Sequence, residues 1–162
     1  MALEEIRGVR EEAAKLEALV APFEEATWWK PTPFKGWSPF DVLAHLHLTD
    51  QSGLLASEDA ARFRAEAALR VQSLVSDKPV LPRERIPHDD PRRLLADWRE
   101  CLGKLCERLD ALDPEARLPW FGPEMGVRMF ASARLCWTFF FDSGSSCSSA
   151  VTGLSAKTSE RA

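Results

Sequence analysis

Ser38-Pro-Phe-Asp-Val-Leu-Ala-His-Leu-His-Leu-Thr-Asp50 is the stretch that decides the fold of this 162-residue chain. It opens with a strong helix-start signal: Ser38 can cap a helix, Pro39 suits the first helical position, and Asp41 is an acidic residue in the first turn. The following residues are apolar most of the way around a helix that we expect to end near Ala56. Such a helix is largely buried, so other elements must surround it.

Segments on both sides of this stretch have the apolar spacing of further helices. Apolar residues three and four apart predict an amphipathic helix over residues 3–21. Asp90-Pro91 repeats the cap signal before a long helix with an apolar stripe, a less regular helix is expected over residues 58–75, and a last one begins near Glu124. No segment of any length alternates like a strand. The pattern predicts an all-α protein, an up-and-down four-helix bundle with room for a fifth helix.

Proline-rich segments separate these helices. Residues 27–36 and 119–123 combine Pro and Gly with Trp and Phe, and we expect their aromatic side chains to pack at the ends of the bundle. Residues 77–90 hold three prolines and the charged Arg83-Glu-Arg85 cluster, which predicts an exposed loop.

The composition is that of one globular domain, with 45% apolar and 28% charged residues. The net charge of −4, from 21 basic and 25 acidic residues, gives no overall attraction to a polyanion, so we expect no nucleic-acid partner. The first residues are charged where a secretory signal is apolar, and no apolar stretch reaches the length of a membrane span. We therefore expect a cytoplasmic protein with no membrane partner.

The cysteines and the end of the chain carry two further predictions. Cys101 and Cys106 fall about 140° apart around the predicted helix, so we expect two buried thiols and no bridge. After Leu135 the chain becomes densely aromatic and then rich in Ser and Thr. This change predicts a helical domain over residues 1–142 and a disordered tail over residues 143–162.

The three histidines are the strongest candidates for a functional site. His45 and His47 lie about 200° apart on the predicted helix, so they cannot bind one metal ion together. His45 shares a polar stripe with Asp41 and Thr49, and a metal is one way to satisfy such a stripe on a buried helix. If His45 binds a metal, Asp41 or Thr49 is expected to support its ring. A hydrogen-bonded core histidine is the alternative. His88 sits between a proline and two aspartates, which suggests capping and not ligation.

Two motifs resemble a known family. The first is Trp37-Ser-Pro-Phe-Asp-Val-Leu-Ala-His45, a Trp followed eight residues later by a His on a capped helix. The second is Trp120-Phe-Gly-Pro-Glu-Met-Gly-Val-Arg-Met-Phe-Ala-Ser-Ala-Arg-Leu135. Together they resemble an actinobacterial-type metal-binding branch of the DinB-like, mycothiol-dependent maleylpyruvate isomerase superfamily, over roughly residues 3–135.

This resemblance implies a four-helix bundle that holds a divalent metal with three side chains. His45 matches one ligand, and the other two are a Glu and a His four residues later on the last helix. Zinc is the first expectation, and nickel, manganese or iron also suit such ligands. In the enzymes of the family the metal lowers the pKa of a small-molecule thiol, such as mycothiol, whose thiolate attacks an electrophilic substrate.

The chain departs from the family pattern at the two remaining ligands. Aligned without gaps, their positions are Trp137 and Phe141, which cannot bind a metal, and Asp142 is about 100° off the required face. We therefore expect His45 as the retained ligand, impaired activity and no assignable catalytic or cofactor-binding residue. The simplest explanation is a reading-frame shift near codon 136, and a diverged, metal-free paralogue is the alternative. The added aromatic residues also favour self-association.

A function of another class fits the same residues. The aromatic loops, with Trp28, Trp29, Trp37 and Trp120, could serve a non-catalytic helical bundle that binds a partner or a small molecule.

Overall fold

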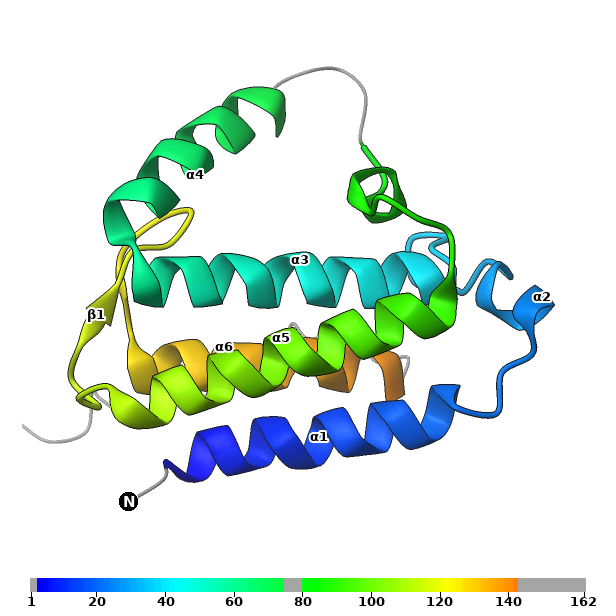
Figure 1. The fold of residues 1–162 in the computed structure, drawn as a ribbon, viewed down its shortest axis with the longest axis horizontal. Helices are drawn as coiled ribbons and strands as arrows, with labels where there is room; N and C mark the ends of the chain where they lie inside the picture. Colours follow the sequence, from blue (N-terminus) through cyan, green and yellow to red (C-terminus); the bar gives the residue numbers. More distant parts are fainter. Residues whose placement is uncertain (1–2, 75–79, 143–162) are drawn as a thin grey trace, which may run out of the picture.

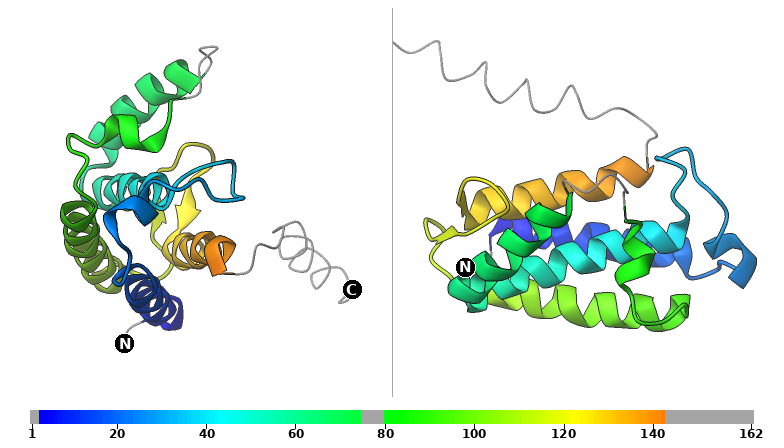
Figure 2. Two further views of the ribbon diagram at one scale, coloured as in Figure 1. Left: turned by 90° about the vertical axis from the view of Figure 1, so that its right-hand side faces the viewer. Right: turned by 90° about the horizontal axis from the view of Figure 1, so that it is seen from above.

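The computed structural model describes residues 3–74 and 80–142, with the backbone alone for residues 71–74 and 136–142. The tail prediction for residues 143–162 lies outside the described residues. Four long helices lie side by side and enclose the main core (Figure 1, Figure 2). They are α1 (Glu4–Val20), α3 (Pro39–Glu58), α5 (Pro91–Ala111) and α6 (Val127–Asp142). The predicted all-α fold, with a DinB-like bundle, is confirmed.

The second and third long helices run in the same direction. Asp50 of α3 accepts a hydrogen bond from Trp98 of α5, and the carbonyl of Ser57 accepts bonds from Arg108, so residue numbers rise together along both helices. The outlying helix α4 (Ala60–Leu74) leads the chain back across the bundle between them (Figure 1). The four long helices therefore follow an up–down–down–up order and not the simple up-and-down order expected from the sequence. The difference arises because α4 is part of a long crossover connection.

The last helix runs antiparallel to α3. Arg134 of α6 pairs with Asp50, whereas Phe130, one turn earlier, lies against Gly53, one turn later on α3. On its other side α6 contacts α1, where Leu135 is close to Gly8. Contact through glycines lets α6 approach both helices closely.

The helix that decides the fold begins where its sequence predicts. Ser38 caps α3 by accepting a hydrogen bond from the backbone N–H of Asp41, while the Asp41 carboxylate accepts one from the backbone N–H of Ser38 at 2.9 Å. Most α3 side chains are buried, as its all-round apolar pattern predicts.

Short elements were not predicted. A four-residue helix, α2 (Glu25–Trp28), and a 3₁₀ turn, η1 (Pro82–Arg85), occupy segments expected to be loops. β1 (Arg117–Leu118) pairs with β2 (Met125–Gly126), so the last helix begins at Val127 and not near Glu124. Strands of two residues are too short to show alternation, which explains why the sequence pattern misses them.

Candidate functional site

His45 lies half-buried on α3 and faces a cavity of about 480 Å³. Five parts of the chain form its described wall: the loop before α3, α3 itself, α4, the segment around η1 and the turn between β1 and β2. Its lining residues are Trp37, His45, Leu48, Thr49, Ser52, Arg70, Val80, Pro82, Arg85, Trp120 and Phe121. The cavity thus joins both motifs singled out in the sequence.

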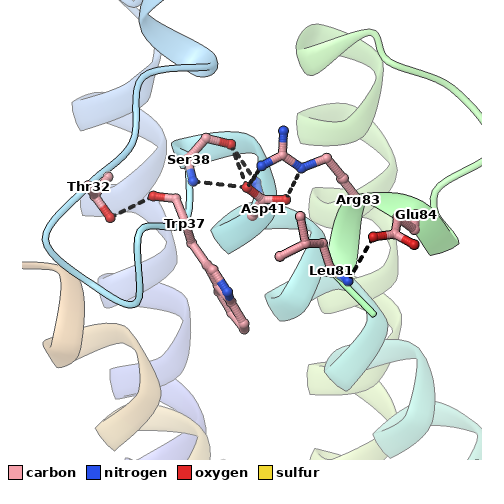
Figure 3. Close-up of polar contacts among 7 residues, drawn as sticks. All are labelled: Thr32, Trp37, Ser38, Asp41, Leu81, Arg83 and Glu84. Carbon is pink, nitrogen blue, oxygen red and sulfur yellow. Dashed lines mark hydrogen bonds and ion pairs between the residues drawn. The ribbon is translucent and has the colours of Figure 1, made fainter. Parts of the chain in front are cut away.

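Trp37 contacts the imidazole directly. Its ring meets the His45 ring edge-on, with the centroids 5.3 Å apart. The Trp37 carbonyl accepts a 2.7 Å hydrogen bond from the hydroxyl of Thr32, which fixes the loop before α3 (Figure 3). Lys35, in the left-handed backbone region at φ 54°, places its ammonium 5.3 Å from the Trp37 ring centroid. The Trp-to-His spacing therefore brings an aromatic ring and a cation to the histidine.

Asp41 does not support His45, contrary to the prediction from their shared stripe. Arg83 binds both oxygens of the Asp41 carboxylate, and Ser38 bonds to one of them (Figure 3). The same ion pair corrects the expectation of an exposed loop, because Arg83 anchors η1 to the buried start of α3 and Pro82 is buried. A partner 42 residues away on the chain cannot be read from a helical stripe.

Thr49, the other predicted neighbour of the His45 ring, is also engaged elsewhere. Its hydroxyl donates to the backbone carbonyl of His45 at 2.8 Å. Burial lowers the pKa of His45 below 6.5, and the positive charges of Lys35 and Arg134 lower it further, against a smaller opposite effect of Asp50. His45 is therefore neutral near pH 7, which is the form that binds a metal.

The end of α6 runs past the level of His45. Backbone positions 137 and 141 follow Arg134 by about one and two turns on the same face, and α6 is antiparallel to α3. These positions therefore lie level with the half of α3 that carries His45. The side chains of Trp137, Phe141 and Asp142 lie outside the described residues.

The described residues do not fit a three-ligand metal centre. Among them, no group of three or more His, Cys, Asp or Glu is placed to hold a metal ion. Within the described wall of the cavity, His45 alone is a common metal ligand, and the Trp and Phe at positions 137 and 141 have no ligating atom.

His47 lies in a different environment, as its position around the helix predicts. It lines a second cavity, of about 370 Å³, together with His88 and Asp97. Its Nε2 is 3.0 Å from the amide nitrogen of Gln51, and its buried Nδ1 has no partner among the described atoms. Burial is the main cause that lowers the pKa of His47 below 6.5. The two histidines thus cannot serve one site.

His88 acts locally, as its neighbours predict. Its Nδ1 accepts a 3.3 Å hydrogen bond from the backbone N–H of Asp90, and its Nε2 is 3.3 Å from a carboxylate oxygen of Asp97. Asp90 in turn caps α5 by accepting bonds from the backbone of Arg92 and Arg93.

The sequence reasoning missed one buried network. Asp50 accepts hydrogen bonds from the Trp98 indole and from Arg134 Nη2, both at 2.9 Å. The available signal was an acidic residue in the apolar middle of α3 and an arginine in α6, but this signal does not identify the two as partners.

The cysteine prediction is confirmed for the described pair. Cys101 and Cys106 are free and buried. Burial raises the pKa of their thiols to about 12 and about 11, so neither is a ready nucleophile.

The four tryptophans of the aromatic loops divide into two sets. Trp28 is buried in the core and Trp29 stacks on Phe40 with centroids 4.6 Å apart, as expected for packing at the bundle end. Trp37 and Trp120 also pack on their neighbours, but both line the His45 cavity.

A helical bundle of this order, with a histidine on its second long helix facing a cavity, defines a DinB-like domain. The comparison with known families agrees: residues 9–138 match the mycothiol maleylpyruvate isomerase N-terminal domain. The chain belongs to this family.

Two curated relatives come from Mycobacterium tuberculosis, and both are described only as uncharacterized proteins. They are Rv0036c of strain H37Rv and MT0041 of strain CDC 1551, each 35% identical to this chain over 137 residues. The match covers 83% of this chain and 52% of each relative, so the chain spans about half their length. No solved structure matches significantly. None of the described helices is both long and apolar enough to span a membrane.

Proposed function

We propose that this chain is a DinB-like domain related to thiol-dependent isomerases and transferases, in which the divalent-metal site is reduced to His45. It binds metal weakly and has little or no thiol-transfer activity. One observation carries this proposal: the described wall around His45 offers hydroxyls, guanidinium groups and aromatic rings, but no second metal ligand. One ligand cannot replace the three that catalytic zinc sites use.

The family supplies the chemistry that a complete site would perform. A zinc, nickel, manganese or iron ion there would lower the pKa of mycothiol or a similar thiol for attack on an electrophilic substrate. This chain contributes a neutral His45 whose ring lies against Trp37. A cytoplasmic location is part of the proposal. The two free thiols support it, because a reducing compartment keeps cysteines in the thiol form. Self-association through residues 135–141 is also part of the proposal. Sedimentation velocity at several protein concentrations would detect it.

A frame shift near codon 136 is the proposed origin of the missing ligands. The family match ends at residue 138, which supports this origin. Reading the nucleotide sequence after codon 135 in all three frames should reveal a Glu-x-x-x-His continuation in a shifted frame. Frames without that spacing would favour a diverged, metal-free paralogue.

Elemental analysis tests the reduced site. After dialysis against zinc, the unmodified chain should hold clearly less than one metal per molecule. The double substitution Trp137→Glu and Phe141→His should raise the content toward one. Trp137→Gln with Phe141→Leu is the matched control, because it changes the same positions without supplying the two ligands. Stoichiometric metal in the unmodified chain would overturn the proposal, and no gain in the restored variant would contradict the ligand set.

A second candidate function is metal-independent binding of a small molecule in the same cavity. Its specific support is that Trp37 and Trp120, from segments more than 80 residues apart, line the cavity together with His45. Cavities of a few hundred Å³ with aromatic walls and few polar groups are typical of small-molecule sites. Binding in the presence of a chelator separates this function from the first.

A further inference from the structure

The His45 cavity is positively charged, although the chain as a whole is acidic. Its described lining contains Arg70 and Arg85 but no Asp or Glu. The ammonium of Lys35 stands beside Trp37, another lining residue. The net charge of the chain is −4, so this is a local concentration of positive charge. A cavity lined by one sign of charge attracts ligands of the opposite sign.

Arg85 is the group that can receive an anion. Among the described residues its guanidinium has no hydrogen bond and no ion pair, in contrast to its neighbour Arg83. The η1 turn that carries it is anchored to α3 by the ion pair of Arg83 with Asp41. It is also capped by Glu84, which accepts a 3.1 Å hydrogen bond from the backbone N–H of Leu81 (Figure 3). Arg85 thus extends from an anchored turn.

Arg70 reaches the cavity from a different element, α4. Its Nη1 donates a 2.9 Å hydrogen bond to the hydroxyl of Ser52, another lining residue, and its Nη2 lies 4.0 Å from Glu66. The bond to Ser52 holds one terminal nitrogen of the guanidinium group against α3. Two guanidinium groups from different elements therefore border one space.

The remaining wall is flat, apolar and rigid. Trp120 stacks nearly parallel on Phe63, with an interplanar angle of 6°, and meets Phe130 edge-on at 5.0 Å. Phe121 packs against both Phe63 and Trp120. Aromatic rings held by other rings offer a pre-organised surface for a planar ligand.

We propose that the His45 cavity binds a small organic anion with a planar apolar body, such as an aryl carboxylate, without a metal ion. The carboxylate pairs with Arg85 and Arg70, and the ring lies against Trp37 and Trp120. This inference rests on the second candidate function and adds the class of ligand to it. Arginine suits this role because its planar fork matches the two oxygens of a carboxylate.

Three naphthyl probes of similar size test the charge preference. Calorimetric titration of the full chain in EDTA would compare 2-naphthoate, 2-naphthylmethanol and 2-naphthylmethylammonium. We expect the anion to bind at least about tenfold more tightly than the alcohol, since hydrogen bonds that involve charged groups are roughly twice as strong as those between neutral groups. The cation should bind most weakly. Equal affinities for the three probes, or no binding of naphthoate, would overturn the proposal.

Arginine variants locate the site. Arg85→Gln should weaken naphthoate binding about tenfold and leave naphthylmethanol binding unchanged. Arg70→Gln should do the same, and it assigns the site to the His45 cavity, because Arg85 also lines the His47 cavity whereas Arg70 does not. Arg92→Gln is the matched control, because Arg92 lines a different cavity at the start of α5. If Arg92→Gln weakened naphthoate binding as much as Arg85→Gln does, the attraction would be nonspecific and the assignment would be contradicted. Naphthoate binding that requires added zinc would overturn this inference while favouring the metal site, whereas the metal content measured above tests the proposed function separately.

Discussion

Asp50 on α3 and Arg134 on α6 form an ion pair that is almost completely removed from solvent, with exposed fractions of 0% and 4%. The indole of Trp98 on α5 donates to the same carboxylate, so three of the four long helices meet at Asp50. The pair fixes the register of α6 against α3, and with it the level at which positions 137 and 141 pass His45.

Breaking this pair should destabilise the fold strongly. Arg134→Met leaves the buried Asp50 carboxylate without its cationic partner, and removal of one member of a buried pair costs about 3–5 kcal/mol. Urea denaturation followed by far-UV circular dichroism would measure the free energy of unfolding.

Two controls separate burial from charge. Arg7→Gln removes the exposed pairs of Arg7 with Glu4 and Glu11 and should cost less than about 1 kcal/mol. Asp50→Leu combined with Arg134→Met should recover part of the lost stability, because no unpaired charge remains. A loss for Arg134→Met no larger than that for Arg7→Gln would show that the buried pair does not secure α6.

Sequence reasoning reached the parts of the fold that depend on local chemistry. Ser38 and Asp41 form a capping box within four residues, and the Asp90 side chain caps α5 by accepting from two backbone N–H groups, so both helix starts could be predicted. The opposite orientations of His45 and His47 also follow from helical geometry alone.

The features that sequence reasoning missed depend on partners far apart in the chain. Asp50 and Arg134 are 84 residues apart, and the sequence around each of them does not distinguish it from a charged residue on the surface. Arg83 was assigned to an exposed loop because nothing nearby reveals that Asp41, 42 residues earlier, is buried and in need of a cation. The cavity was missed for the same reason, since its wall comes from segments between residues 37 and 121 that lie far apart in the chain.

Replacement of glycine by alanine should have opposite effects on stability at two helical positions, Gly53 and Gly103. A Cβ at Gly53 would lie 2.5 Å from Phe130 Cζ, in a ring already wedged against Trp120. We expect Gly53→Ala to destabilise the fold by about 1–3 kcal/mol through overpacking. Gly103, in the middle of α5, has nothing within 4 Å of such a Cβ, so Gly103→Ala should stabilise it by about 0.5–1 kcal/mol. Thermal unfolding of the two variants would show whether their shifts have opposite signs.

Cys101 and Cys106 should resist thiol reagents while the chain is folded. Burial raises the pKa of these thiols to about 12 and about 11, so few thiolates exist at pH 8. In a Cys136→Ser, Cys147→Ser background, dithionitrobenzoate should react with both only after urea is added. Rapid reaction of the folded chain would show that the thiols are accessible.

The same shifts predict a loss of stability at alkaline pH. An unfolded thiol releases its proton near pH 9, whereas these folded thiols retain theirs until about pH 11–12. Between these values the unfolded state binds fewer protons, so the free energy of unfolding falls as the pH rises. The limiting slope is about 1.4 kcal/mol per pH unit for each thiol. A Cys101→Ala, Cys106→Ala variant should lose this part of the pH dependence.

His45 and His47 should respond differently to metal, because they line separate cavities. In the variant with Trp137→Glu and Phe141→His, His45→Ala should lower zinc affinity by more than the roughly 10–100-fold that loss of an outer-shell partner costs, since it removes a direct ligand. His47→Ala should leave zinc affinity unchanged. Because this substitution also removes a buried imidazole, the unfolding curves of both variants are compared as a control for stability. Competition with a chromophoric zinc chelator would measure the affinities. If His47→Ala abolished binding and His45→Ala did not, the metal would belong to the cavity shared by His47, His88 and Asp97, and the ligand assignment would be wrong.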